Sequence, residues 1–481
     1  LSLGGSVLGV LLALASMPVM AHFVPETIAA WAHPEMNWTV LLFTVLIAVT
    51  AALMFALFGQ SAAAARPQEA LSQGNRGSTD SRQKLRSTLV VGEIALTTII
   101  LTSTGLLGGS FWKLAHTDLG FNPSFVLTVR TQLPVSAQTR YREFAARVNF
   151  YQRVLHRVAH LPGVQAAGYT TFLPFTNPGG STTVLVKGAP SLPIGEVNDV
   201  KMRVVTPDYF RTLEIPLLRG RTFTDADGNN KTPLAVINHK MAQRYWPNGD
   251  AVGRQFRFDD QGTPWITVIG IVGDVHQADV ETPSRTEMYF FYGQSLRIPG
   301  FFMPRDLAIR VTGDPVSYTS AVEHAIWSVD PEQPVSEAQS MQHIVNTRME
   351  TYIVEAKLFA FFSCTALLLS ALGIYGLMSY SVTRRRQEIG IRMALGAQRE
   401  QVLTSFIAAG FRLLVIGLLL GALGSVASTR LLGSMLYGIS GIGWGVGALP
   451  LIVLAVSVTL ATYIPARRAA RTDPIQALRA E

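Results

Sequence analysis

The sequence predicts a multi-domain membrane protein, in which an α-helical transmembrane bundle of about six helices is combined with a large extracytoplasmic α+β domain. Three observations support this fold class. The 481 residues exceed a single ordinary domain, and 48% of them are hydrophobic, with a mean hydropathy of +0.28. Charged residues make up only 15% and are unevenly distributed. Long apolar runs occupy both ends of the chain, whereas the middle is polar and rich in turn residues.

Six apolar runs are long enough to cross a bilayer, which takes about 20 helical residues. Only helices and closed barrels satisfy their backbone polar groups in lipid, so each run is expected to be a helix. The runs cover residues 3–21, 38–58, 88–111, 358–380, 406–428 and 444–464. Glu93 is the one acid well inside a run, which makes it a functional candidate. The simpler interpretation, which we favour, is that it snorkels to the interface or faces another helix.

The orientation follows from clusters of basic residues beside the second, fourth and sixth runs. Cytoplasmic segments carry an excess of Lys and Arg, so these three clusters are expected in the cytoplasm and residues 113–357 outside it. The same clusters account for much of the formal net charge of +8, and no basic stripe interleaved with aromatics occurs elsewhere, so nucleic acid is not an expected partner. The clusters comprise Arg66, Arg76, Arg82, Lys84, Arg86, then Arg384, Arg385, Arg386, Arg392, Arg399, and finally Arg467, Arg468, Arg471, Arg479.

Two runs share a glycine pattern that indicates an internal repeat. Gly5 and Gly9 of the first run are followed by Ala-Ser at the same offset as Gly417 and Gly421 of the fifth. Small residues spaced by four also permit close helix packing in lipid. We therefore expect residues 1–71 to be the last two helices of a first unit and 72–87 a cytoplasmic linker to a second unit. Because the chain begins inside an apolar run without Met, it is expected to be a fragment of something longer.

The exterior region has mixed polarity and short β-rich runs near Gly, Pro, Asn and Asp. Strands are predicted at residues 126–130, 182–187, 201–205, 234–238 and 266–272. Helices are predicted at residues 137–160, 239–245 and 207–213, the last with Thr206 as N-cap. A final helix from about Ser340 should continue toward the fourth span, because no Gly or Pro occurs between Met341 and Lys357.

The sequence lacks the motifs of several classes of enzyme and metal-binding protein. The sequence has no Gly-Lys pair, which the phosphate-binding loop of an ATPase requires, and no His-Glu-x-x-His, Cys-x-x-Cys or Gly-x-Ser-x-Gly. His156 and His160 could share a helix face as metal ligands, but a solvated face is the favoured interpretation. The single cysteine, Cys364, excludes an intrachain disulfide. No catalytic, cofactor-binding or metal-binding residues are predicted.

Residues 384–397 read RRRQEIGIRMALGA and predict a short, basic, amphipathic helix. Such a helix could lie on anionic lipid or dock a cytoplasmic protein. RQEIGIRMALGA resembles the coupling segment of the MacB/FtsX-like ABC permeases. The exterior stretches TPDYF (206–210), LRGRTF (218–223) and VIGIVGD (268–274) resemble the MacB-like periplasmic core domain of that family.

The resemblance implies a domain order. It gives a transmembrane helix at 88–111, a periplasmic core domain at 112–356, and an FtsX-like permease domain with three transmembrane helices at 357–481. The preceding helices resemble the duplicated orphan permeases of acidobacteria, here incomplete at the N-terminus. The residues expected to couple to an ATPase are Arg386, Glu388, Ile389, Gly390, Arg392, Ala394, Leu395, Gly396 and Ala397.

The function implied is a permease subunit of mechanotransmission (type VII) kind in a bacterial inner membrane. A cytoplasmic ABC ATPase dimer would bind ATP, and its hydrolysis would drive a periplasmic change that exports or extracts peptides, lipoproteins or amphipathic compounds. The chain itself would be no enzyme and would hold no cofactor. Two permease units would pair, within one chain or between chains, with a periplasmic adaptor or enzyme as a further partner. The alternatives are a signalling permease that regulates a cell-wall hydrolase, and a membrane scaffold without an ATPase.

Overall fold

The computed structural model describes residues 37–60, 77–134, 140–188, 199–229, 232–247, 249–259, 264–297, 303–384, 398–431 and 444–470, with a few isolated positions. The chain divides into two compact units. Unit 1 comprises Leu1–Ala115 and Glu350–Glu481, and unit 2 comprises His116–Met349. The predicted first span, residues 3–21, lies outside the described residues apart from isolated positions.

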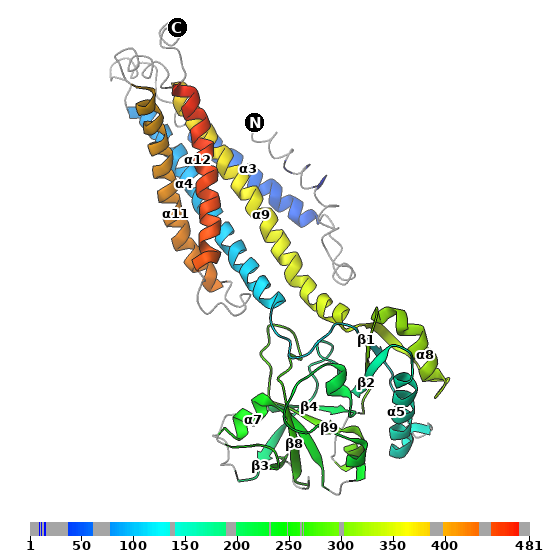
Figure 1. Ribbon diagram of the computed structural model, residues 1–481. Helices are drawn as coiled ribbons and strands as arrows, with labels where there is room; N and C mark the ends of the chain where they lie inside the picture. Colours follow the sequence, from blue (N-terminus) through cyan, green and yellow to red (C-terminus); the bar gives the residue numbers. More distant parts are fainter. Residues whose placement is uncertain are drawn as a thin grey trace. The chain divides into compact units, whose positions relative to one another are not determined.

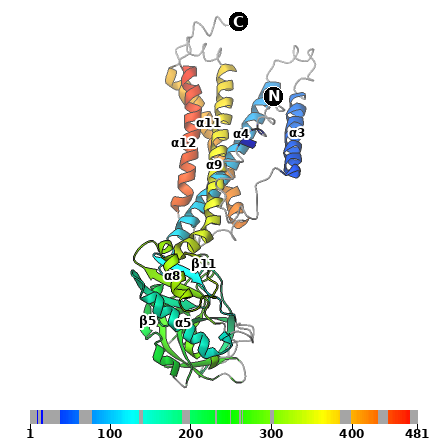
Figure 2. The same ribbon diagram turned by 90° about the vertical axis from the view of Figure 1, so that its right-hand side faces the viewer.

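Unit 1 consists of helices. Those described are α3 (Trp38–Gln60), α4 (Gly77–Ala115), α9 (Met341–Arg384, which begins in unit 2), α11 (Arg399–Leu431) and α12 (Trp444–Ala470). Helices α4, α9, α11 and α12 run side by side in both views (Figure 1, Figure 2). Apolar side chains fill the space between them, and Ile94, Ile374, Leu414, Leu454 and Val458 are buried there.

Four helices among the described residues are long and apolar enough to span a membrane. They run over Arg86–Ala115, Met341–Thr383, Thr404–Arg430 and Leu451–Arg468, and overlap the last four predicted spans. The second predicted span is helical within α3, where Leu41–Thr50 forms a shorter apolar stretch. Helix α4 begins at Gly77, so much of the expected linker 72–87 is helical. No Gly or Pro occurs between Ser78 and Val91 to stop it.

One lobe of unit 2 has the order strand-helix-strand, strand-helix-strand. Its elements are β1 (Val126–Arg130), α5 (Phe144–Ala159), β2 (Val164–Thr170), β10 (Asp306–Val311), α8 (Thr319–Trp327) and β11 (Ser336–Ser340). The strands pair in the antiparallel order β11-β1-β10-β2. Two interleaved βαβ crossovers give this order, which is that of a ferredoxin-like sheet.

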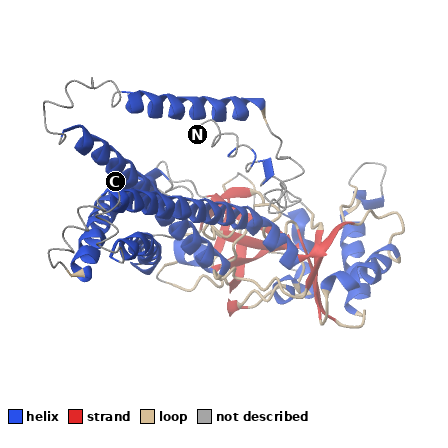
Figure 3. Ribbon diagram, turned by 90° about the horizontal axis from the view of Figure 1, so that it is seen from above, coloured by secondary structure: helices blue, strands red, loops and turns tan. Residues whose placement is uncertain are grey.

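The chain between β2 and β10 forms a second lobe. Its strands are β3 (Ser181–Val186), β4 (Asp199–Val205), β5 (Leu217–Gly220), β6 (Leu234–Asn238), β7 (Gln255–Phe258), β8 (Ile266–Val272) and β9 (Glu287–Phe291). The pairings β4-β3-β7-β8-β6-β9 return from β9 to β4, so six strands close a ring, with β5 added to β8. Figure 3 shows the strands in red. Closure leaves the six strands without a free sheet edge between them.

Burial explains why the second lobe closes. All five residues of β6 and all five of β9 are buried, as expected for strands covered on both faces. Short helices α6 (Tyr209–Thr212) and α7 (His239–Tyr245) connect its strands. The aromatic rings of Tyr209, Phe210 and Tyr289 pack edge-on or tilted within the core.

Most predicted elements of unit 2 are present. The bounds of β1, β6, β8 and α7 are those predicted, and β3 and β4 differ by one or two residues. The predicted start of α5 at residue 137 is wrong, because α5 begins at Phe144. A 3-10 turn precedes it and Glu143 is extended, since Arg140 and Tyr141 both bond to Asp330.

The N-cap predicted for α6 is also wrong. Helix α6 begins at Tyr209 with Asp208 at the cap position and no side-chain cap bond. The Thr206 hydroxyl instead accepts a 2.8 Å hydrogen bond from the Tyr169 backbone N–H. The Thr206 hydroxyl oxygen therefore bonds to the backbone of β2 and does not cap α6.

Candidate functional site

The segment expected to couple to an ATPase lies outside the described residues. This applies to all nine of its predicted residues: Arg386, Glu388, Ile389, Gly390, Arg392, Ala394, Leu395, Gly396 and Ala397. Its neighbours are described, because α9 ends at Arg384 and α11 begins at Arg399. The segment therefore connects two long helices of unit 1.

Hydroxyl groups tie the flanking helices to α4. The Thr104 hydroxyl lies 2.5 Å from that of Ser363 in α9, and Thr102 lies 2.6 Å from Ser425 in α11. The Thr97 hydroxyl donates to the Ala366 carbonyl of α9 over 3.3 Å. Interhelical hydroxyl bonds of this kind position helices that have no hydrophobic drive to associate in lipid. Helix α4 is thus bonded to both helices that flank the predicted coupling segment.

The glycines that indicated an internal repeat lie at the closest approach of α11 to α4. A Cβ at Gly417 would lie 2.5 Å from Ile94, and one at Gly421 would lie 2.4 Å from the Thr98 Cβ. Glycine is required at both positions for this packing. The close packing expected from their spacing is confirmed for the fifth span. In the first span, no described atom lies within 4 Å of the Cβ position of Gly9, and Gly5 lies outside the described residues.

Glu93 faces a neighbouring helix. Its carboxylate lies over Gly373 of α9, where an added Cβ would be 2.3 Å from Glu93 Oε2. Gly373 therefore leaves the space that this side chain occupies. Glu93 is half-buried, in agreement with the interpretation that it faces another helix.

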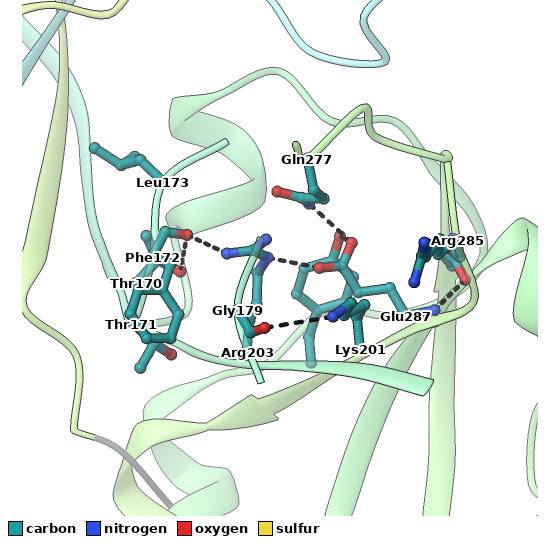
Figure 4. Close-up of polar contacts among 12 residues, drawn as sticks. Thr170, Thr171, Phe172, Leu173, Gly179, Lys201, Arg203, Gln277, Arg285 and Glu287 are labelled. Atoms are coloured by element: carbon teal, nitrogen blue, oxygen red, sulfur yellow. Dashed lines mark hydrogen bonds and ion pairs between the residues drawn. The ribbon is translucent and has the colours of Figure 1, made fainter. Parts of the chain in front are cut away.

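Unit 2 contains a buried ion pair that the sequence analysis did not identify. Arg203 of β4 donates from Nε to Glu287 Oε1 of β9 over 2.5 Å, and from Nη1 to the Phe172 carbonyl over 2.6 Å (Figure 4). The parallel pairing of β4 with β9 places the two side chains two residues apart in register. Burial lowers the pKa of the Arg203 guanidinium, but the Glu287 carboxylate together with Tyr209 and Tyr289 raises it by more, so the net pKa is raised. The Arg203 guanidinium therefore keeps its charge.

Further polar groups complete the environment of Glu287. Its Oε2 accepts from Gln277 Nε2 over 2.8 Å and from the Tyr289 hydroxyl over 2.7 Å. Burial raises the pKa of Tyr289 well above its usual range, and the Glu287 carboxylate raises it further, so the phenol stays a donor. Within the described part of the chain, Arg203 Nη2 and Gln277 Oε1 are buried without a hydrogen-bond partner. The network thus keeps one donor and one acceptor unused.

A cavity of about 270 Å³ opens beside this network. Glu287 and Gln277 line it together with two cationic side chains, Lys201 and Arg285. This arrangement can bind a polar ligand through charge and hydrogen bonds. Among the described residues, no group of three or more His, Cys, Asp or Glu could hold a metal ion.

The histidine pair considered for metal binding lies elsewhere in unit 2. The rings of His156 and His160 stack at 4.3 Å between centroids, and His160 Nδ1 lies 2.6 Å from the His156 carbonyl. One ring nitrogen is therefore already engaged by backbone. Both residues are exposed, His156 on α5 and His160 at its C-terminal cap, which agrees with a solvated surface.

Comparison with known proteins identifies two domains. A family model described as the MacB-like periplasmic core domain matches residues 39–329, and one described as the FtsX-like permease C-terminal domain matches residues 360–474. The macrolide export ATP-binding/permease protein MacB of Marinobacter nauticus is 27% identical over 273 residues, which cover 55% of this chain and 41% of that protein. The protein of the same name from Escherichia coli K12 is 26% identical over 299 residues, covering 58% of this chain and 43% of that protein.

The chain thus spans less than half the length of these curated relatives. Among solved structures, the periplasmic region of MacB from Actinobacillus actinomycetemcomitans matches with a TM-score of 0.33 and 13% identity, over 49% of this chain and 97% of that chain. The extracellular domain of the noncanonic ABC-type transporter YknZ from Gram-positive bacteria matches with a TM-score of 0.29 and 13% identity, over 45% of this chain and 100% of that chain.

Proposed function

Because this chain belongs to the family of permeases with a MacB-like periplasmic core domain and an FtsX-like C-terminal domain, we propose that it is the permease subunit of an ABC transporter in a bacterial inner membrane. The observation that carries the proposal is the match of the core-domain model to residues 39–329. A membrane location agrees with four helices of spanning length among the described residues.

ATP would be bound by a separate cytoplasmic ATPase. The curated relatives are named ATP-binding/permease proteins, and this chain aligns with less than half of their length. Its sequence has no Gly-Lys pair for a phosphate-binding loop. We assign docking of the ATPase to Glu388, Gly390 and their neighbours between α9 and α11.

Closure of the ATPase around nucleotide would shift the conformation of the helices that flank the docking segment. A ligand changes such an equilibrium only by binding one state more tightly, and nucleotide bound to a docked partner supplies that difference. Helix α9 would transmit the shift, because it continues without a break from Met341 to Arg384. The exterior domain would then act on peptides, lipoproteins or amphipathic compounds outside the membrane.

The test is affinity capture of the chain in mild detergent, followed by mass spectrometry and ATPase assay of the eluate. The Glu388→Lys variant reverses a charge in the docking segment, and Glu400→Lys makes the same change in the first turn of α11. We expect an ABC ATPase to co-purify with the wild-type chain and Glu400→Lys but to be lost with Glu388→Lys. Recovery of no ATPase by intact wild-type protein would refute the proposal and favour a scaffold.

A further inference from the structure

A second concavity adjoins the cavity beside Glu287. It has a volume of about 620 Å³ and is open to solvent. The two concavities share the residues Thr282, Pro283, Ser284 and Arg285, which form the wall between them. We call the pair the bipartite groove. One extended ligand could therefore contact both sides of this wall.

Cationic side chains dominate the bipartite groove. Lys201 and Arg285 line the smaller cavity, and Lys240 and Arg244 line the open concavity beyond the wall. Two acids also line it. Glu287 pairs with the buried Arg203 at 2.5 Å, and Asp199 lies 3.6 Å from Arg285, so the side chains that line the groove are four cations and two acids. A surplus of positive charge in a concave, partly desolvated site attracts anionic groups.

Among the described residues, the contacts of the two cations in the smaller cavity are long. Lys201 Nζ lies 3.4 Å from the Gly179 carbonyl, and Arg285 Nη1 lies 3.6 Å from Asp199 Oδ2 (Figure 4 shows Lys201 and Arg285 on the Glu287 side of the network). Strong charge-assisted hydrogen bonds are about 2.7–2.9 Å long. Neither contact prevents these two side chains from turning to a ligand anion.

A second observation points independently to a ligand. In Figure 4, the Arg203 guanidinium and the Gln277 amide converge on the Glu287 carboxylate that lines the cavity. Among the described residues, Arg203 Nη2 and Gln277 Oε1 have no partner, and the Arg203 side chain is fully buried. Gln277 lines the cavity, so its unpaired Oε1 is a group with which a bound ligand or its ordered water could form a hydrogen bond.

The lining favours a carboxylate over a phosphate. Phosphate sites commonly use free backbone N–H groups at a helix N-terminus. In α7, which borders the open concavity, the Lys240 N–H donates to Asp274 and the Met241 N–H to Asn238, so these amides are already used. An ammonium and a guanidinium, by contrast, suffice for one carboxylate. Pro178 and Pro283 add rigid apolar walls of the kind that pack against a peptide backbone.

We propose that the bipartite groove binds an acidic peptide, with a carboxylate between Lys201 and Arg285 and the rest of the chain crossing the wall toward Lys240 and Arg244. The smaller cavity, with a volume of about 270 Å³, has room for the last one or two residues of such a peptide. The inference goes beyond the proposed function, because binding to this groove needs neither nucleotide nor an ATPase.

The experiment measures fluorescence anisotropy of a labelled peptide, fluorescein-Ala-Asp-Ala-Glu-Ala with a free C-terminus, titrated with the 481-residue chain in neutral-lipid nanodiscs. We expect saturable binding that salt weakens. Lys201→Gln and Arg285→Gln should each reduce affinity about tenfold, as expected for loss of a charge-assisted bond. Arg153→Gln, the matched control, removes an exposed cation from α5 of the same unit and should bind like wild type.

Three results would overturn the proposal. The first is absence of binding, and the second is equal affinity of Arg285→Gln and wild type. The third is displacement of the peptide by millimolar inorganic phosphate but not by acetate, which would assign the groove to phosphate groups instead. An amidated version of the peptide should bind more weakly than the free acid. Since no ATPase is present, failure here leaves the capture experiment of the proposed function unaffected.

Discussion

The Arg203 guanidinium bonds to the Glu287 carboxylate at 2.5 Å, and both side chains are shielded from solvent, with exposed fractions of 0% and 2%. The two residues come from strands β4 and β9, which pair in parallel. Removing two charges from water is costly, and their attraction offsets that cost only while both are present. The pair therefore makes the stability of the second lobe sensitive to single substitutions at either position.

Glu287→Leu should destabilise unit 2 strongly, because it leaves the Arg203 charge buried and unpaired. Breaking a buried ion pair costs about 3–5 kcal/mol. The double variant Arg203→Met with Glu287→Leu should recover much of the loss, since it removes both charges. Chemical unfolding followed by tryptophan fluorescence measures the difference. A double variant no more stable than the single one would show that the charges themselves are not responsible.

Gly421→Ala should lower the melting temperature of the helix bundle. The new Cβ would lie 2.4 Å from the Thr98 Cβ and 2.8 Å from the Ala95 carbonyl oxygen, so α11 and α4 must separate. Overpacking of this kind costs roughly 1–3 kcal/mol. Gly376→Ala in α9 is the matched control, because nothing lies within 4 Å of its Cβ position, and it should be neutral or slightly stabilising. Equal melting temperatures for the two variants in detergent would contradict the close packing.

Lowering the pH should reduce the contribution of the Asp227 carboxylate to the free energy of unfolding. Arg221 donates two hydrogen bonds to the Asp227 carboxylate, at 2.7 and 2.8 Å, and these lower its pKa below the usual value. A carboxyl whose pKa is lower in the folded state contributes stability above its unfolded pKa, about 3.9, and loses it as the pH falls through the folded pKa. The contribution is modest, because the Arg221 side chain is half exposed and screened by water.

Asp227→Asn tests this pH dependence. The difference in melting temperature between wild type and Asp227→Asn should be largest at neutral pH and should narrow below about pH 4. Glu332→Gln, at a largely exposed side chain, serves as the control for acid effects on the rest of the chain. A difference that stays constant down to pH 3 would mean that the ion pair is not the cause.

Val354→Pro should separate ATPase docking from action outside the membrane, if the proposed function is correct. Val354 lies in the interior of α9, where proline removes a backbone hydrogen bond and costs about 3 kcal/mol. The ATPase should still co-purify, because the docking segment is unchanged, whereas ATP-dependent export should be lost. Val354→Ala keeps the helix and should retain both activities. Normal export by Val354→Pro would exclude α9 as a rigid connection.

The local signals of the sequence were sufficient for elements whose residues all favour one conformation. Strands β6 and β8 are short apolar runs beside turn residues, and α7 follows an Asn that caps it through a 3.0 Å bond to Met241 N–H. Where a residue far away in the sequence determines the local conformation, the local sequence pattern does not predict the element correctly. The start of α5 depends on Asp330, which lies 189 residues from Tyr141, and no local pattern contains that contact.

The ion pair of Arg203 and Glu287 could not be predicted from the sequence, because it also depends on residues far apart in the chain. Arg203 and Glu287 are 84 positions apart, and only the closure of the strand ring brings them together. One signal was present, because Arg203 interrupts the apolar end of a predicted strand, where a charge requires a buried partner. The identity of that partner depends on strand order, which the spacing of turn residues does not specify.

Strands β1 and β11 begin and end unit 2 as neighbours in one sheet, with Thr128 opposite Gln339. Paired strands lie about 4.8 Å apart, so the two ends of this domain are fixed close together whatever its interior sequence becomes. The second lobe, inserted between β2 and β10, likewise leaves and returns to adjacent strands. An inserted lobe whose two ends lie next to each other can be replaced by another such lobe. The replacement changes the entropy cost of closing the surrounding chain only slightly. A lineage could therefore acquire a different second lobe as one insertion while the helices of unit 1 evolve separately.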